Sequence, residues 1–469
     1  IEELLRWAEP AETPASRLRA AIERAAGGKG RPPEPLQLDL EKVLEIAAVT
    51  SREFQNQKES LFLSALSLSS TRYDYGWTRL TLTGGYGVDG NDDDATSSGS
   101  ATLSYSKRAV LFGASILGSL FHSFSRTITG SDDWDTSSLI SLGLTQPLLQ
   151  GFGSHIALEG LTQAERDVIY DVRDFERYRR DLVVRLTSSY YSLLQRQDRI
   201  AIEEENIRNL EKSLARLEEM KKTGRTPKVQ VDQTRQSVLR SRATLLALKE
   251  TLEGALDSFK ITLGLPVAAE IELDMKEFEE LQQKGIPVQG LDQERCVRIA
   301  LARRLDLKTT GDRLADAGRA VVIAADNLQN IIDLGLDVEV PTKEGKGAQP
   351  DWKNATFGAG IDWSIPLDKT PQRNAYRSAL IAFERSRRDL LLREDTIRRE
   401  IRSRLRSLAQ IRQDFLIQQN SVALARERVD EAETKQEMGR AIVRDVLEAR
   451  ESLVSAQSSL SNLILDYLT

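Results

Sequence analysis

The stretch LTQPLLQGFG, at residues 144–153, separates two kinds of sequence pattern. Before it, apolar residues occupy every second position, as at Ile140 and Leu142, with Ser or Gly between them. After it, residues 155–223 contain no proline and a single glycine. A period of two is typical of a half-buried strand, whereas a long segment without helix breakers favours a helix. Because proline ends a strand ladder and glycine permits a sharp turn, this stretch predicts a strand-to-helix junction with Pro147, Gly151 and Gly153 at its turning points.

Upstream of the junction, the alternating pattern extends over residues 76–148. Its apolar positions are Leu80 and Leu82, then Ala101, Leu103 and Tyr105, then Val110, Phe112, Ala114 and Ile116. Two turn-rich stretches, DGNDDDATSSG at 89–99 and GSDDWDTSS at 130–138, interrupt it. Together with a second strand region near residue 340, the chain offers four strands, or six if residues 101–124 form a further hairpin.

Downstream of the junction, a helix over residues 155–223 would be roughly 100 Å long at 1.5 Å per residue. Its apolar residues recur in steps of three, four and seven, which is typical of a coiled-coil seam. These residues are Leu182, Leu186, Tyr190, Leu193, Ile200, Ile207, Leu214 and Leu217. A return helix over 229–263 is predicted to end at Gly264, since Pro266 prevents its continuation.

The same order of elements then occurs a second time. The second set comprises a helix, two strands and another long helix, at residues 293–330, 334–340, 357–365 and 372–438, followed by a last helix. Pro147 lies 77 residues before Gly224, and Pro366 lies 73 residues before Gly439. The matching order and spacing predict a tandem internal repeat with strands inserted in each half.

These patterns predict an α+β fold and divide the chain into eight segments. They are a polar lead-in at 1–35, a first-repeat helix at 36–75, strands at 76–148, a long helix with its return at 149–263, an irregular linker at 264–292, a second-repeat helix at 293–331, strands at 332–368, and a second long helix with its return at 369–469.

Composition excludes several classes of function. A net charge of −6 and a pI near 5.5 give no basic footprint for nucleic acid. One cysteine, Cys296, and two histidines cannot supply a disulfide or a Cys/His metal cluster. The sequence also contains no phosphate-binding glycine loop and no nucleophile elbow, so we expect neither catalysis nor a cofactor.

The strands suggest how the chain could meet a membrane. Its uncharged runs fall short of the roughly 20 apolar residues that a membrane-spanning helix needs, so any crossing would use a β-barrel. Each strand has about ten residues with one apolar face, which suits a tilted membrane strand. Membrane barrels begin at about eight strands, so copies must pool their strands, and three copies of four would close a twelve-stranded barrel. A further hairpin at 101–124 could enlarge that barrel, extend outside the membrane or fold into the lumen.

The long helices need companions for the same reason. A narrow apolar stripe leaves charged faces on both sides, so the helices of several copies could pack as a helical cylinder beneath the strands. In this arrangement Asp337, Glu339 and Asp362 face a watery lumen. Alternating strands also form soluble sandwiches, and striped helices also form cytosolic rods. A structural or tethering coiled-coil protein without transport activity is therefore the alternative.

From residue 36 onward, the chain resembles the TolC family of outer-membrane efflux proteins. Four stretches carry the resemblance: LTQPLLQGFG at 144–153, SIPLDKTPQRNAYRSAL at 364–380, ALARRLDLK at 300–308 and MGRAIVRDVLEARESLVSAQ at 438–457. The first two resemble the family's strand-to-helix junctions, the second of which contains Pro366. The third resembles the start of its second repeat, and the fourth resembles the hairpin at its closed end.

The resemblance implies a passive exit duct and not an enzyme. It implies a homotrimer in outer-membrane lipid, with a transmembrane β-barrel and an α-barrel of antiparallel coiled-coil helices that projects into the periplasm. The duct would dock on a periplasmic adaptor coupled to an inner-membrane pump, in a tripartite efflux pump or a type I secretion system. Drugs, metals and proteins all stay open as substrates. Because the chain begins at Ile1, we expect that a processed or disordered leader precedes it.

The resemblance also assigns roles to the ends of the helical hairpins. The tip turns, which contact the adaptor, match Gly224, Arg225, Gly439 and Arg440. The first hairpin departs from the family pattern, because Pro227 stands in its turn and Gln230 stands where an aspartate is common. This departure puts gating contacts between the two hairpins in doubt.

An acidic ring at the aperture matches Asp445 and Glu448, which share a helix face because they are three residues apart. Three copies would place six carboxylates around the opening, enough to bind cations and repel anions. Alternatively, these two residues are ordinary solvated charges that pair with Arg444 and Arg450.

Overall fold

The computed structural model describes residues 35–90, 95–109, 112–127, 134–276, 278–280, 285, 290–343, 349–438 and 440–468. The predicted lead-in at 1–35 lies outside these residues except for its last position. The chain folds as two compact units. The sheet unit comprises Ser60–Asp174 and Arg304–Thr396, and the helical unit comprises the described parts of Ile1–Glu59, Phe175–Arg303 and Ile397–Thr469.

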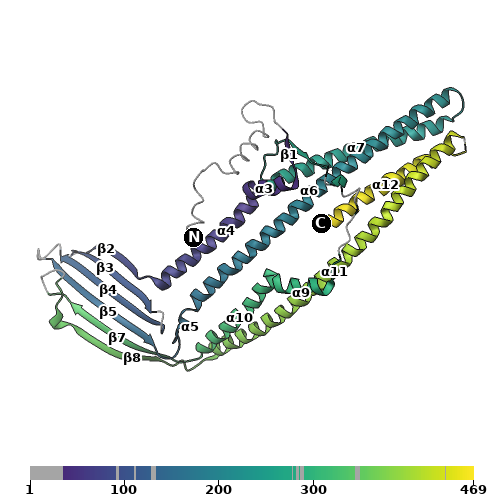
Figure 1. Cartoon of the computed structure of the whole chain (residues 1–469). Coiled ribbons are helices and arrows are strands. Elements are labelled where there is room, and N and C mark those ends of the chain that lie inside the picture. Colours follow the sequence, from purple (N-terminus) through teal and green to yellow (C-terminus); the bar gives the residue numbers. More distant parts are fainter. Residues whose placement is uncertain are drawn as a thin grey trace. The chain divides into compact units, whose positions relative to one another are not determined.

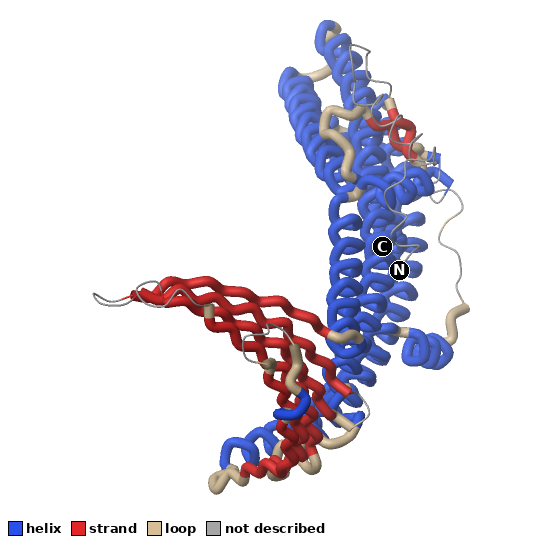
Figure 2. Tube along the Cα trace, turned by 90° about the vertical axis from the view of Figure 1, so that its left-hand side faces the viewer, coloured by secondary structure: helices blue, strands red, loops and turns tan. Residues whose placement is uncertain are grey.

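In the described part of the sheet unit, six strands form one antiparallel sheet (Figures 1 and 2). The strands are β2 (Arg79–Gly90), β3 (Ala95–Ala109), β4 (Ala114–Thr127), β5 (Asp135–Pro147), β7 (Ile331–Pro341) and β8 (Thr356–Ser364). They lie in the order β2-β3-β4-β5-β7-β8, so β2 and β8 are the edges. Residues 101–124 do form a hairpin, built from β3 and β4, and both of its strands belong to this sheet.

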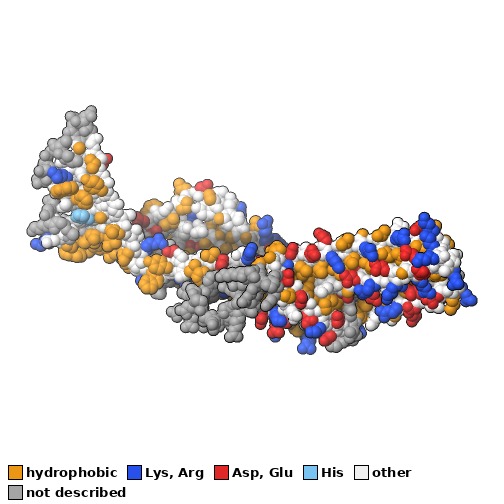
Figure 3. All heavy atoms as spheres, turned by 90° about the horizontal axis from the view of Figure 1, so that it is seen from above, with side chains coloured by type: hydrophobic (Ala, Val, Ile, Leu, Met, Phe, Trp, Pro, Cys, Tyr) orange, Lys and Arg blue, Asp and Glu red, His pale blue; other side chains and the backbone are white. Residues whose placement is uncertain are grey.

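The strand register gives the sheet one apolar and one polar face. One row of paired residues runs Leu82, Leu103, Leu120, Ile140 and Val340, and the next row runs Thr81, Ser104, Ser119, Ser141, Glu339 and Thr356. Paired residues point to the same side of a sheet and adjacent rows to opposite sides. The apolar face is exposed in the single chain, as the 74% exposure of Leu82 and the 72% exposure of Trp363 show. Figure 3 shows apolar side chains gathered over the strands.

The remaining elements are helices and one small sheet. The sheet unit also contains α5 (Ser154–Ala157), α10 (Leu305–Asp326) and η3 (Trp352–Asn354), and the helical unit contains β1 (Leu36–Leu38), α3 (Leu40–Thr50), α7 (Lys228–Leu263), β6 (Ile271–Leu273), α9 (Gln293–Arg303) and α12 (Val443–Leu468). Three helices contribute residues to both units: α4 (Arg52–Gly76), α6 (Glu159–Lys222) and α11 (Thr370–Glu437).

None of the helices within the described ranges combines the length and the apolar character that crossing a membrane requires.

The core of the helical unit forms around the predicted seam of α6. Its buried members from that seam are Leu182, Leu186, Tyr190 and Leu193. The Tyr190 hydroxyl, which is fully buried, donates to the carbonyls of Leu38 and Asp274, at 3.3 Å each. These carbonyls belong to or follow β1 and β6, which pair in parallel. The core therefore fixes the β6 part of the predicted linker region onto β1.

Two helix ends are set by single residues, and the end at Gly264 was predicted. Asp39 caps α3 by accepting a hydrogen bond from the Lys42 N–H at 2.8 Å, and Gly264 ends α7. The helix predicted at 36–75 is divided, however, into β1, α3 and α4. The boundary between α3 and α4 falls at the buried Ser51, whose extended backbone ends α3.

Candidate functional site

The two helical hairpins, α6–α7 and α11–α12, end in closely similar turns (Figure 1). In the first turn, Gly224 has a φ of +72°, which a side chain would strain, and the Arg225 N–H donates to the Met220 carbonyl at 2.9 Å. In the second turn, the Arg440 N–H donates to the Lys435 carbonyl at 2.8 Å. The predicted tip residue Gly439 lies outside the described residues. Both turns thus use the same helix-ending hydrogen bond.

The positions of these turns also match. From Lys222 to Glu437, where α6 and α11 end, the offset is 215 residues. From Lys228 to Val443, where α7 and α12 begin, it is again 215 residues. Each helix of the first hairpin therefore has a counterpart at a constant distance along the chain.

The hairpins contact each other near their tips. Leu217 of α6, Val231 of α7 and Val443 of α12 form a buried cluster, each at most 3% exposed. Among the described residues, two ion pairs cross between the hairpins, Arg216 to Glu437 at 2.6 Å and Arg240 to Glu451 at 3.5 Å. All four charged side chains are more than half exposed, so each pair contributes little stability by itself. The apolar cluster therefore holds the two hairpins together. It does so although Pro227 and Gln230 of the first hairpin depart from the family pattern.

The two predicted ring residues are exposed on α12, beside the helix face that buries Val446 and Ala449. Asp445 accepts a hydrogen bond from the Ile442 N–H at 3.3 Å, so it also caps the start of α12. Glu448 pairs with Arg428 of α11 at 3.1 Å. This partner differs from the neighbours that the sequence suggested.

The first strand-to-helix junction is held by a residue that sequence reasoning missed. Gly151 and Gly153 both have positive φ, at +83° and +103°. The N–H of Gly151 donates at 2.8 Å to the carboxylate of Asp326, which is only 7% exposed at the end of α10. A buried carboxylate needs such a donor, so Asp326 and the junction stabilise each other.

The segment that follows α10 joins both junctions. The Gln150 side chain donates to Asn327 at 3.0 Å, next to the first junction. At the second junction, three residues after Pro366, the Lys369 ammonium donates to the Leu328 carbonyl at 2.9 Å and to the Asn330 side chain at 2.6 Å. The only sequence signal for this role was the position of the segment between a helix and a strand.

We expect replacement of Gly153 by alanine to lower the free energy of unfolding by about 1–3 kcal/mol, because a φ of +103° with a ψ of 147° is a conformation that side chains rarely adopt. Urea titration followed by circular dichroism measures the change. Gly143→Ala is the matched control, since the nearest atom to its new methyl group is the Leu117 carbonyl oxygen at 4.0 Å. Equal losses for the two variants would contradict a conformational requirement at the junction.

The predicted lumen-facing acids lie together on the polar face of the sheet. Asp337 and Glu339 are two residues apart on β7, and Asp362 of β8 pairs in register with Asp333 of β7. Asp337 and Glu339 line a groove with serines of β3, β4 and β5. Asp333 extends this acidic set and was not predicted.

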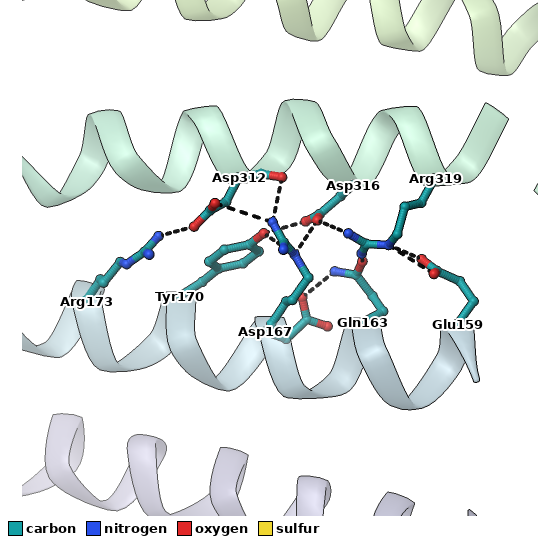
Figure 4. A network of polar contacts seen from close by, with 9 residues as sticks. Glu159, Gln163, Asp167, Tyr170, Arg173, Asp312, Asp316 and Arg319 are labelled. Carbon is teal, nitrogen blue, oxygen red and sulfur yellow. Dashed lines mark hydrogen bonds and ion pairs between the residues drawn. The ribbon is translucent and has the colours of Figure 1, made fainter. Parts of the chain in front are cut away.

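A polar network fastens α6 to α10 within the sheet unit (Figure 4). Arg166 pairs with Asp316 at 2.5 Å, Arg173 pairs with Asp312 at 2.6 Å, and Arg319 pairs with Glu159 at 2.9 Å. The Tyr170 hydroxyl donates to Asp316 at 2.5 Å. Burial and this donation to a carboxylate raise the pKa of Tyr170. The network fixes one helix against the other.

Comparisons with known proteins agree with this architecture. The family model for outer membrane efflux proteins matches residues 70–264 and 296–469. Among solved structures, the chain is similar to the outer membrane protein VceC of Vibrio cholerae (TM-score 0.68, 16% identity, 92% of this chain and 93% of that one). It is also similar to CusC (0.66, 16%, 94% and 92%) and to the Campylobacter jejuni outer membrane channel CmeC (0.65, 13%, 91% and 83%). No curated protein matches.

The two-faced antiparallel sheet and the paired hairpins form the fold that these solved outer-membrane proteins share. The family match covers well over half of the sequence. The chain belongs to the outer membrane efflux protein family, which confirms the resemblance found in the sequence. Proteins of this family are passive efflux channels of the outer membrane.

Proposed function

We propose that the chain is one subunit of a homotrimeric exit duct, which conducts substrates passively from a periplasmic adaptor and an inner-membrane pump to the exterior. The observation that carries the proposal is the sheet, whose apolar face is exposed and whose two edges are unpaired among the described residues. In lipid, the apolar face can contact the acyl chains, but the unpaired N–H and C=O groups of an open edge have no hydrogen-bond partner. Copies that join edge to edge satisfy both requirements, with the apolar face toward lipid.

The polar face then lines the lumen. Its Ser and Thr rows, together with Asp337, Glu339 and Asp362, supply a wet surface with negative charge. A tethering coiled-coil protein has no use for such a sheet, so the sheet favours the duct. The experiment is extraction in detergent, where we expect a trimer that forms ion-conducting pores in planar bilayers. A stable soluble monomer without conductance would refute the proposal.

The helical hairpins would project into the periplasm as part of an α-barrel. The constant offset of 215 residues between their ends supports a tandem repeat, so three copies supply six similar hairpins. The exposed tips are basic, with Arg225 and Arg440 in the turns beside Lys221 and Lys228. We assign adaptor contact to these tips, because exposed cations favour an acidic partner surface.

Asp445 and Glu448 would form the acidic ring at the aperture. Both are exposed on the same side of α12, so neighbouring copies could bring six carboxylates around the opening. Their hydrogen bonds, from Ile442 and Arg428, hold the carboxylates in place without burying them.

We expect the double variant Asp445→Asn, Glu448→Gln to require roughly tenfold more divalent cation for half-block of the single-channel current, because a narrow pore concentrates the field of its charges. Planar-bilayer recording with added Mg²⁺ measures the block. Asparagine retains an oxygen that can cap α12. The matched control is Glu427→Gln, Asp430→Asn, an exposed pair three residues apart on α11 that removes the same charge. If the two variants required the same Mg²⁺ concentration for half-block, the assignment of Asp445 and Glu448 to the acidic ring would be wrong.

A further inference from the structure

We propose that the assembled duct closes with eighteen strands, in which β8 of one copy pairs antiparallel with β2 of the next. This inference rests on the proposed trimer and adds how its subunits meet and how wide the barrel is. The twelve-stranded estimate assumed four strands in each copy, whereas the described residues place six in one continuous sheet.

The hairpin β3–β4 is part of the wall and not an appendage. With 15 and 14 residues, its strands are the two longest of the sheet, and about 9–11 residues suffice for a tilted strand to cross a bilayer. Strand β3 pairs with β2 along the whole of β2, and β4 pairs with β5 over Ser115–Ser125 and Asp135–Thr145. Removing β3 from the wall would break the β2–β3 ladder, and removing β4 would break the β4–β5 ladder.

The turn of this hairpin is anchored at the level where strands become helices. The Phe112 carbonyl accepts hydrogen bonds from the Gln146 side chain at 3.1 Å and from the Gly153 N–H at 3.4 Å. The Phe112 ring stacks on that of Phe152, with centroids 6.1 Å apart. The hairpin thus extends down to the strand-to-helix junction, as its neighbours do.

The two edges are suited to each other. Six is an even number, so β2 and β8 run in opposite directions in this sheet, and β8 of one copy meets β2 of the next antiparallel. The apolar residues Leu82 of β2 and Phe357 and Ile361 of β8 belong to the same face. Pairing of the edges therefore continues the apolar face around the ring without a break.

Both edges are also free to pair. Every described residue of β2 is exposed, and neither edge carries the Lys or Pro residues that block edge pairing in soluble proteins. Strands β2 and β8 of one chain do not pair with each other in the described residues, and six strands are fewer than the smallest membrane barrels contain. A second copy of the chain is therefore the partner that the edges fit.

The experiment is disulfide cross-linking between the edges, in the full chain with its natural cysteine removed (Cys296→Ser). One cysteine is placed at Leu82 on β2, and the other is placed in turn at Phe357, Ala359 or Ile361 on β8. A disulfide requires Cβ atoms about 3.8 Å apart, so we expect oxidation to link at least one pairing into covalent dimers and trimers that reductant dissolves. Within one chain, β2 and β8 are separated by four strands, so a cross-link reports contact between copies.

Two controls make the result specific. Thr81→Cys moves the β2 cysteine to the polar face and should abolish the cross-link with the same β8 positions. Leu120→Cys places the cysteine on β4 instead of β2. A cross-link from this position to β8 of another copy would show a narrower barrel whose wall leaves out β2 and β3. A trimer with this link, or with no link between β2 and β8 at any position, overturns the eighteen-stranded closure alone. A protein that is not a trimer overturns the proposed function as well.

Discussion

Replacement of Tyr190 by alanine is expected to lower the free energy of unfolding of the helical unit by about 3–5 kcal/mol, because it removes a large side chain from a site with no solvent exposure. The ring packs at the centre of the core that joins α6 to the β1–β6 pair. Equilibrium urea titration in detergent, followed by circular dichroism at 222 nm, measures the change.

Tyr190→Phe separates packing from hydrogen bonding. It keeps the ring and removes only the hydroxyl, whose two bonds are long at 3.3 Å, so we expect a loss of about 1 kcal/mol. If the phenylalanine variant were as unstable as the alanine variant, the two carbonyls of Leu38 and Asp274 would dominate and the packing argument would be wrong.

Removal of the Asp306 carboxylate is expected to cost about 3 kcal/mol, because it leaves cationic partners without their counter-charge in a largely buried site. Asp306 is 8% exposed at the start of α10. It accepts from Arg304 at 3.1 and 2.9 Å and also from Arg393 of α11. Urea titration of Asp306→Asn measures the loss, and Asp389→Asn, at an exposed position of α11, is the control. Equal stabilities of the two variants would contradict a supporting role for Asp306.

The same site predicts a pH dependence. Burial opposes ionisation of Asp306, but hydrogen bonds from Arg304 and Arg393 outweigh it, so its pKa in the folded protein lies far below the usual value of 3.8. A lowered pKa contributes stability that is fully present above the unfolded value and is lost as the pH falls below it. The stability difference between the wild type and Asp306→Asn should therefore narrow between about pH 5 and pH 2. A constant difference over this range would exclude the ionised carboxylate as its cause.

Much of the fold follows from local pattern. The alternation around Leu80, Leu103 and Leu142 is what a sheet with one apolar face requires, and the seam at Leu182 and Tyr190 is buried as a coiled-coil stripe should be. These features depend on neighbours in sequence, so periodicity is sufficient to predict them.

Contacts between distant segments could not be predicted in this way. Nothing local indicates that Asp326 accepts from Gly151, that Glu448 pairs with Arg428, or that β1 pairs with β6. The stretch ALARRLDLK resembled a family motif, but only its fold shows why Arg304 and Asp306 belong together, since Arg393 completes the group from α11. Likewise, the alternation of apolar and polar residues at 101–124 is compatible with a hairpin but does not show where the hairpin lies. Its position in the sheet depends on the pairing of β3 with β2 and of β4 with β5.

The even strand counts have a consequence for how such ducts diversify. In the described residues, four strands lie between α4 and α5 and two lie between α10 and α11, so each set returns to the end of the sheet where it began. A gene segment that encodes one more hairpin can therefore enter either set without redirecting any helix or disturbing the proposed aperture. In the proposed threefold ring, each such insertion would add six strands at once, so the width of the barrel could change in large steps while the hairpin tips proposed to contact the adaptor stay constant.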